Sequence, residues 1–345
     1  MNEKERFIFF DIMRIILTLL VVLGHMNFTG FDSNKYTGAV SWFISRQQTM
    51  LTWIYTFHMA AFMFLSGACF RVEKYYSFDQ LVIEKLKRLV VPTFGMALFI
   101  ILPFKLITGM LHGTTEALVV VNDLLRGTGD YTQFWFMLAL FWVFFFSYFP
   151  IRYIYIYIYM RPKHKNAVLA FIAIYLIARY LPRIDMENLF LFKTGLSYLV
   201  VFFLGYLFKD REMYRYLSTG SCIVYQLLYW GLMSQSGNIE LNFYVLQLLG
   251  ITFCVTLSFL IEKLLVLDEK AKKCVAFLAK RTKYVYYYHV LIIWGFSLYL
   301  YRYYNTNIEF VLGAILLLLS CMLVPFAIEK GVDYICALQK RKAKL

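Results

Sequence analysis

The amino-acid sequence predicts an all-α integral membrane protein, a bundle of about ten transmembrane helices with both termini in the cytoplasm. Of the 345 residues, 61% are hydrophobic and only 16% are charged, whereas a soluble domain needs roughly 25% charged residues. Apolar runs of about 20 residues, long enough to cross a bilayer, recur along the chain. Lysine and arginine gather in every second segment between these runs, as expected of cytoplasmic loops.

Ten apolar runs are candidate spanning helices. The first, residues 7–28, has charged flanks but no small-residue cleavage site, so we interpret it as a spanning helix and not as a removable signal peptide. The others fall near residues 48–69, 89–110, 132–152, 167–183, 194–208, 217–235, 242–265, 284–304 and 308–328.

Local features mark several helices of the first half. The second helix ends in Ser66-Gly67, a pair that permits a bend or a close approach of two backbones. The third begins beside Pro92, after a basic cluster. We expect Pro150 to interrupt the fourth helix, and we interpret the alternating Tyr-Ile segment at 153–159 as a bent helix end, since an open strand edge cannot face lipid.

The helices of the second half are predicted mainly from their apolar runs. The ninth follows a strongly basic stretch, residues 262–283, and opens with a tyrosine-rich segment. A short basic segment follows the tenth. We therefore expect one transmembrane domain over residues 1–330 and a basic cytoplasmic tail over residues 331–345, with no soluble domain, linker or convincing repeat.

The net charge of +14 does not indicate nucleic acid binding, because most basic residues fall in the segments predicted to face the cytoplasm. Topology explains this charge, together with attraction to anionic lipid or to an anionic cytosolic ligand. The six cysteines show no Cys-x-x-Cys or metal-like spacing, so we predict neither disulfides nor a metal site.

His25 is the residue that suggests function most directly. It follows Arg14 by eleven positions within the first apolar run, so both side chains lie on nearly the same helix face, about 16 Å apart along the axis. Asp11 and Thr18 share this face. Ionisable groups at membrane depth are costly and usually have a purpose. The stripe indicates either a functional cavity or a structural polar network that ties helices together.

Two further groups are candidates for function. His58 and His289 lie in the second and ninth helices. Lys85 and Arg88 belong to the basic cluster before the third helix. Such a cluster is usually only a sign of topology, but near Arg14 it could also bind phosphates, and spacing alone leaves this open.

The chain as a whole resembles the membrane acyltransferase-3 family, bacterial enzymes that transfer acyl groups to cell-surface polysaccharides. The resemblance spans nearly the full length, and its motifs are weak singly but specific in this order. They comprise Asp11, Arg14 and His25; His58, Phe62, Phe64, Ser66 and Gly67; Lys85, Arg88 and Pro92; Trp135 and Phe136; Phe202 to Gly205; and Tyr286 and His289. The family has arginine where this chain has Lys85, which weakens the case for a bidentate contact there.

The resemblance implies an O-acyltransferase that moves an acyl group, acetyl in the first instance, from cytosolic acyl-CoA to a hydroxyl of an extracytoplasmic or lipid-linked polysaccharide. It implies His25 as the catalytic residue, either a general base or a transient acyl carrier. The implied acyl-CoA-binding residues are Arg14, Arg88, Lys85 and Asp11, with Asp11 orienting the arginine. Candidates for the tunnel lining or the oxyanion site are His58, Ser66, Gly67, Trp135 and His289.

Acyl-CoA would then be a co-substrate, with no permanently bound cofactor and no metal. The implied partners are the glycan and the lipids of the bacterial cytoplasmic (inner) membrane, and a homo-oligomer is compatible with the sequence. The alternative is a carrier that exports a polysaccharide or a lipid-linked sugar without chemistry. Against it, no paired Gly- or Pro-broken helices occur in matching halves of the chain. A structural scaffold would leave the buried ionisable residues without purpose.

Overall fold

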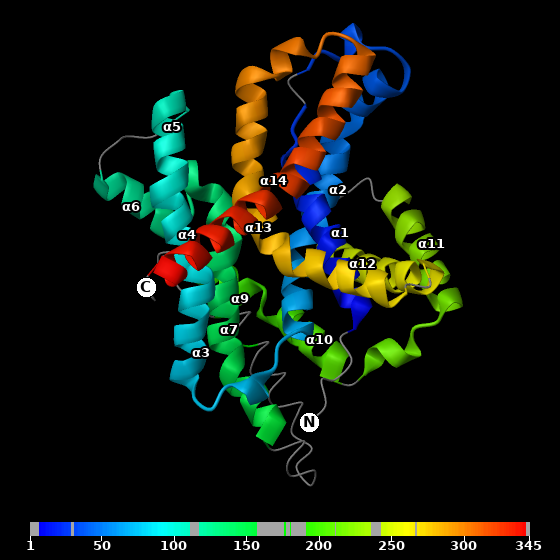
Figure 1. Cartoon of the computed structure of the whole chain (residues 1–345). Coiled ribbons are helices and arrows are strands. Elements are labelled where there is room, and N and C mark those ends of the chain that lie inside the picture. Colours follow the sequence, from blue (N-terminus) through cyan, green and yellow to red (C-terminus); the bar gives the residue numbers. More distant parts are fainter. Residues whose placement is uncertain are drawn as a thin grey trace. The chain divides into compact units, whose positions relative to one another are not determined.

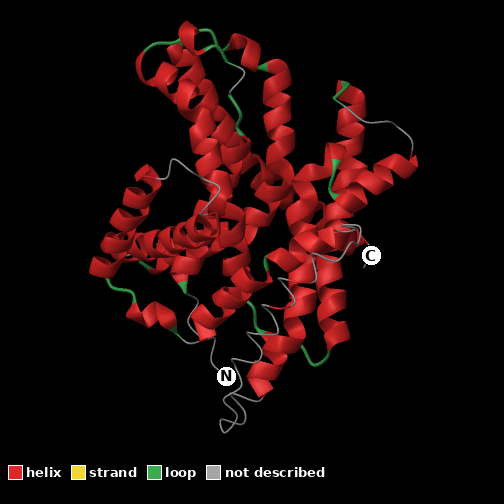
Figure 2. Cartoon of the chain, turned by 180° about the vertical axis from the view of Figure 1, so that it is seen from behind, coloured by secondary structure: helices red, strands yellow, loops and turns green. Residues whose placement is uncertain are grey.

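A computed structural model of the chain describes residues 7–28, 31–110, 117–156, 176, 180, 191–210, 212–235, 243–265 and 268–342. Nearly all of these residues are helical and none lies in a strand (Figure 2), which confirms the predicted all-α class. Six of the described helices are long and apolar enough to cross a membrane: Ile8–His25, Gly38–Ala68, Phe78–Thr108, Tyr131–Ile154, Val245–Leu265 and Asn307–Gly331. The count of about ten spans and the cytoplasmic termini stay predictions. The span expected at 167–183 lies almost wholly outside the described residues.

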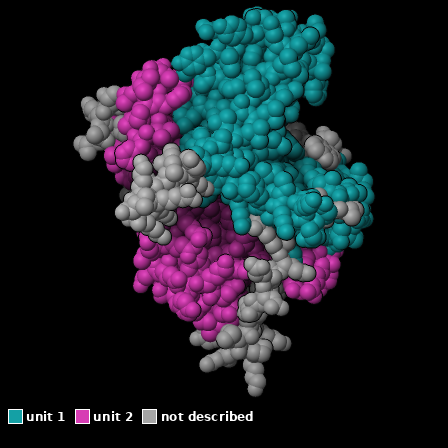
Figure 3. Space-filling view, viewed as in Figure 1, with its two compact units in different colours: residues 1–61, 217–345 teal, residues 62–216 magenta. Residues whose placement is uncertain are grey.

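The chain forms two compact units (Figure 3). The first comprises residues 1–61 and 217–345, and the second comprises residues 62–216. Helix α2 (Gly38–Ala68) is continuous and contributes residues to both units. The boundary expected after residue 330 falls inside the last helix, α14 (Asn307–Lys342).

The first unit is built around α1. Its other helices besides α2 and α14 are α11 (Thr219–Gln235), α12 (Phe243–Leu265) and α13 (Glu269–Tyr299). Helix α1 (Ile8–His25) packs against α12 and α13, and α13 packs against α14 (Figure 1). An ion pair between Arg281 of α13 and Glu329 of α14, 2.6 Å long, joins the last two helices.

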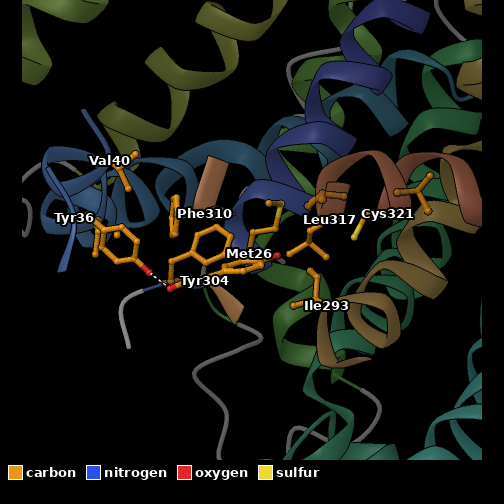
Figure 4. Close-up of a cluster of buried hydrophobic side chains, with 12 residues drawn as sticks. Met26, Tyr36, Val40, Ile293, Tyr304, Phe310, Leu317 and Cys321 are labelled. Carbon is orange, nitrogen blue, oxygen red and sulfur yellow. Dashed lines mark hydrogen bonds between the residues drawn. The ribbon is translucent and has the colours of Figure 1, made fainter. Parts of the chain in front are cut away.

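An apolar cluster joins α1, α2, α13 and α14 in this unit (Figure 4). Val22 and Met26 contribute from the end of α1, and Ile293, Phe310 and Leu317 from α13 and α14. The Tyr36 hydroxyl donates a hydrogen bond of 2.5 Å to the Tyr304 carbonyl, so the chain after α1 is bound to the connection between α13 and α14.

The second unit contains one long composite helix. It consists of α3 (Phe78–Lys85), the π-helical turn η3 (Leu86–Val90), α4 (Val91–Met96), a second π-helical turn η4 (Ala97–Ile101), and α5 (Leu102–Thr108). The two π turns end two residues before Pro92 and Pro103, which lack the N–H group that a regular α-helix uses. The other helices are α6 (Ala117–Arg126), α7 (Trp135–Ile154), α9 (Phe192–Ser197) and α10 (Leu199–Asp210).

Several helix boundaries differ from the prediction. The third span begins at Phe78 and not at 89, because the Ser77 side chain caps its N-terminus by accepting the N–H of Gln80. The ninth begins at Glu269 and not at 284, because Asp268 accepts the N–H of Ala271 at 2.7 Å. Segments predicted as inner loops are therefore largely helical.

The expected interruption of α7 at Pro150 is wrong. The helix continues through Pro150 to Ile154, and both Ile151 and Ile154 are fully buried. Packing on the following turn keeps the helix continuous although the proline removes one backbone hydrogen bond.

Two glycines allow α2 and α10 to touch through their backbones in the second unit. A Cβ atom on Gly67 would overlap the carbonyl oxygen of Phe202, and a Cβ atom on Gly205 would overlap that of Phe64. Small residues at such crossings permit close packing of membrane helices. The close approach expected from Ser66-Gly67 is therefore present.

Alanine at either crossing glycine should destabilise the protein. We expect Gly67→Ala and Gly205→Ala each to cost about 1–3 kcal/mol, because the added methyl group meets backbone that must shift. Gly95→Ala is the matched control, since nothing lies within 4 Å of its Cβ position in α4, and alanine is the better helix former. Thermal unfolding in detergent micelles measures the difference. Equal melting temperatures for the three variants would contradict this account of the crossing.

Candidate active site

Three histidines from three helices of the first unit gather at the end of α1. His25 is the last residue of α1, His58 lies in α2 and His289 lies in α13. The His25 and His289 ring centroids are 5.1 Å apart. The ring of Tyr55 lies 6.4 Å from that of His25 and 5.2 Å from that of His58, and so connects the third histidine to the pair.

The tautomers of two of these histidines follow from their hydrogen bonds. Nδ1 of His58 lies 2.7 Å from the Ile54 carbonyl, and Nδ1 of His289 lies 2.9 Å from the Val285 carbonyl. A carbonyl oxygen only accepts, so Nδ1 carries the proton in both rings. In the neutral form, each Nε2 is then left with a free lone pair and can act as an acceptor or a base.

His289 has an unusual environment for a polar side chain. It is only 1% exposed, and its Nε2 has no hydrogen-bond partner among the described residues. Most buried polar atoms do have a partner, and an exception needs an explanation. The rings of His25 and Tyr286 lie beside it, with their centroids 5.1 and 6.2 Å from its own.

The two buried histidines repeat one local arrangement. Tyr55 precedes His58 by three residues, and Tyr286 precedes His289 by three. Each tyrosine ring lies beside the imidazole of its own helix, 5.2 and 6.2 Å away between centroids. Both pairs have the sequence Tyr-x-x-His, but the family resemblance includes only the second pair, so sequence reasoning does not identify Tyr55.

Side chains from α2 hold the end of α1 in place. The Tyr55 hydroxyl donates 2.9 Å to the Gly24 carbonyl. The Gln47 amide donates 2.7 Å to the Met26 carbonyl, and its oxygen accepts the Phe28 N–H at 2.8 Å. Backbone groups at a helix end lack intrahelical partners, so these bonds satisfy the residues on both sides of His25. Sequence reasoning missed Gln47, because a single glutamine in an apolar segment gives no hint of its partners.

The rest of the predicted stripe lies on α1 as expected from its spacing. Asp11 and Thr18 are buried and Arg14 is partly buried. The Thr18 hydroxyl donates to the Arg14 carbonyl at 2.8 Å, so its proton is used within the helix. Arg14 and His25 thus stand on one continuous helix, about 16 Å apart along its axis.

The basic candidates Lys85 and Arg88 belong to the second unit and differ in environment. The Arg88 side chain is 70% exposed and pairs with Glu84 at 3.1 Å. Lys85 Nζ instead lies 3.6 Å from the ring centroid of Phe144, with the rings of Tyr75 and Phe70 within 6 Å. Aromatic faces attract a cation, so Lys85 is held by rings while Arg88 faces outward.

Burial and the nearby Glu84 raise the pKa of Tyr75 to about 12. This phenol therefore stays neutral beside Lys85 and donates to Glu84 at 3.4 Å. The aromatic surroundings of Lys85 thus carry no charge of their own at neutral pH.

The remaining predicted residues also lie in the second unit. Ser66 is partly buried near the end of α2, and Gly67 is at the crossing with α10. Trp135 is the first residue of α7, with its ring centroid 6.1 Å from that of Tyr198. Among the described residues, no three His, Cys, Asp or Glu side chains are placed to bind a metal ion.

An unprotonated imidazole at this site could take up a proton or act as a nucleophile, since both reactions need a nitrogen lone pair. His25 is partly buried, whereas His58 and His289 are enclosed. Of the three, His25 is therefore the histidine best placed to meet a substrate.

A family model described as an acyltransferase domain matches residues 7–330 of the chain. No curated protein and no solved structure matches the chain.

Replacing Gln47 should weaken the end of α1. We expect Gln47→Ala to destabilise the protein by about 1–3 kcal/mol, because it leaves the Met26 carbonyl and the Phe28 N–H buried without a partner. Gln48→Ala is the control, since Gln48 is the next residue of the same helix and is exposed. Melting temperatures in micelles compare the two. A loss no greater than that of Gln48→Ala would show that the Gln47 bonds contribute nothing.

Proposed function

This chain belongs to the membrane acyltransferase-3 family, and from that premise we propose that it is an O-acyltransferase. It transfers an acyl group, acetyl in the first instance, from cytosolic acyl-CoA to a hydroxyl of an extracytoplasmic or lipid-linked polysaccharide. The family and the apolar helices make it a multi-pass membrane acyltransferase. The proposal includes acyl-CoA as the donor and a polysaccharide hydroxyl as the acceptor. It also places the protein in the bacterial cytoplasmic membrane.

The observation that carries the proposal is the position of His25 beside His289 and Tyr55 at the end of α1. In our mechanism the His25 imidazole takes the proton of the acceptor hydroxyl. The oxygen attacks the thioester carbonyl, the C–S bond breaks, and the CoA thiolate takes up the proton. A base positioned in this way contributes about 10²–10⁴ to the rate. A transient acyl-histidine is the other route by which His25 could act.

On the donor side, Arg14 and Arg88 are the proposed partners of the CoA phosphates. Arginine offers charged donors in a fixed planar fork that suits phosphate. Arg88 is supported by its exposure, and Arg14 by its place on the helix that ends in His25. Asp11 then orients Arg14, and Lys85 has a supporting role because it is held by aromatic rings.

On the acceptor side, the proposal names a glycan hydroxyl and no permanently bound cofactor. His58 and His289 serve as polar lining around His25, and Ser66, Gly67 and Trp135 support the second unit. Membrane lipids surround the helices, and self-association is compatible with this function.

The decisive experiment is acyl transfer by protein purified into lipid vesicles. We expect the parent to consume acetyl-CoA with a glycan acceptor, and His25→Gln to lose about 10²–10⁴ in rate while it folds and binds CoA as the parent does. Glutamine keeps hydrogen-bonding capacity but takes up no proton near neutral pH. A stable glutamine variant with the parent rate would remove His25 from the mechanism. A parent that neither binds nor consumes acyl-CoA would favour the export protein.

Donor binding gives a separate prediction. We expect Arg14→Ala and Arg88→Ala each to weaken the affinity for free CoA about tenfold or more, because a charge-assisted hydrogen bond contributes about 1.5–3 kcal/mol. Arg215→Ala is the matched control: Arg215 is 66% exposed and pairs with Glu212 within its own turn, as Arg88 pairs with Glu84. Calorimetric titration measures the dissociation constants. If Arg215→Ala weakens binding equally, the effect is one of overall charge and the assigned site is wrong.

A further inference from the structure

We propose that His289 is the positioning residue for His25: its Nε2 accepts the N–H of the His25 ring and so decides which His25 nitrogen keeps the lone pair. The inference rests on the proposed function for its role in the reaction. The contact between the His25 and His289 rings does not depend on the proposed function.

The first support is the unpaired state of His289 Nε2. His289 is 1% exposed and its Nδ1 is committed to the Val285 carbonyl, so only Nε2 is available to a second partner. That atom is buried and has no hydrogen bond among the described residues. A buried acceptor left unpaired is costly, so a donor is expected to reach it in the working state.

The second support is distance. A hydrogen bond of about 2.9 Å between two ring nitrogens places the centroids of the imidazoles about 5 Å apart. The His25 and His289 centroids are 5.1 Å apart, with the ring planes inclined by 58°. The separation of the two rings is therefore already the one that such a hydrogen bond requires, so α1 and α13 need not move closer together.

In the part of the chain that the structure describes, no other group donates a hydrogen bond to His289 Nε2. Tyr286, on the same helix, places its ring centroid 6.2 Å away. The thiol of Cys321 in α14 points to the backbone of His289 and not to its imidazole: Sγ lies 3.7 Å from the carbonyl oxygen. Tyr55 uses its hydroxyl proton on the Gly24 carbonyl. The ring of His25 lies closer to that of His289 than the ring of Tyr286 does, so His25 is the donor that we assign.

The consequence for the reaction concerns the tautomer of His25. A ring whose N–H is held by His289 presents its other nitrogen, unprotonated, to the acceptor hydroxyl. During transfer that nitrogen takes the hydroxyl proton and passes it to the CoA thiolate as the C–S bond breaks. The N–H toward His289 stays in place throughout, and His289 stays neutral. This is the orienting role that a carboxylate has in serine hydrolases, filled here by a neutral imidazole.

The contact can be tested without any activity. The chain has five histidines, so protein labelled with nitrogen-15 at histidine alone gives few imidazole signals in solid-state NMR of membrane samples, each assignable by a single His→Gln variant. We expect His25→Ala to move the His289 Nε2 resonance toward that of a free neutral imidazole. The control Cys321→Ala disturbs the packing behind His289 and should leave the resonance in place. An unchanged Nε2 resonance in His25→Ala would overturn the contact.

Kinetics test the positioning role. We expect His289→Ala to lower kcat about 10²-fold, a loss typical for a residue that orients a reacting imidazole, with KM for acyl-CoA unchanged. His289→Gln retains an acceptor oxygen and should recover about tenfold of this loss, the effect of one hydrogen bond, although it cannot act as a base. Cys321→Ala should retain the parent kcat.

The outcomes separate this inference from the proposed function. If the parent transfers acyl groups, His25→Gln does not, and His289→Ala retains the parent kcat, the positioning role is wrong and the function stands. If the glutamine variant is no better than the alanine variant, His289 does not act by accepting a hydrogen bond. If the parent shows no acyl transfer, the proposed function fails, and the NMR result still decides the contact.

Discussion

The candidate site depends above all on how the end of helix α1 is held. The last carbonyls of a helix have no partner of their own, and in apolar surroundings such groups are costly. Tyr55 and Gln47 of α2 bind the backbone at Gly24, Met26 and Phe28, which fixes where α1 stops and therefore where His25 stands. The apolar cluster of Figure 4 packs around the same helix end: Val22 and Met26 lie within three residues of His25 in sequence, and Val285 and Ile293 lie one turn on either side of His289. Polar bonds thus set the position of the helix end, and apolar packing sets its distance from α13.

The fold class could be predicted from the sequence because the length of an apolar run reflects the thickness of a bilayer. Helix boundaries were predicted less well, since a helix does not have to stop at the membrane surface. Ser77 and Asp268 extend α3 and α13 well beyond their apolar parts by capping the N-termini, and both residues are of the kind that favours this position. The interruption predicted at Pro150 does not occur for a related reason: buried isoleucines on the following turn keep α7 helical. The tendency of proline to end a helix is overcome here by packing that forms only in the folded unit.

The candidate site was predictable in part. Helical spacing placed Arg14 and His25 on one face of one helix, which needs no knowledge of any other element. The contact between His25 and His289 depends on α13 packing against α1, and residues 264 positions apart carry no spacing that reveals it. A weaker indication was present in the two Tyr-x-x-His pairs, whose tyrosines and histidines must share a helix face. Gly67 had two interpretations in the sequence, and its place against Phe202 supports a packing role.

The neutral partner that we propose for His25 is consistent with the physics of the membrane. A carboxylate beside an imidazole would hold its N–H more strongly, but it would bring a permanent charge to a depth where ionised groups are expensive. An imidazole whose Nδ1 is tied to a helix carbonyl offers an acceptor of fixed direction and adds no charge. His289 and His58 both have this arrangement, so the helices themselves select the tautomer that leaves Nε2 open. In the proposed mechanism, His25 then accepts a proton during transfer with no second charge buried next to it, which lowers the electrostatic cost of that step among apolar helices.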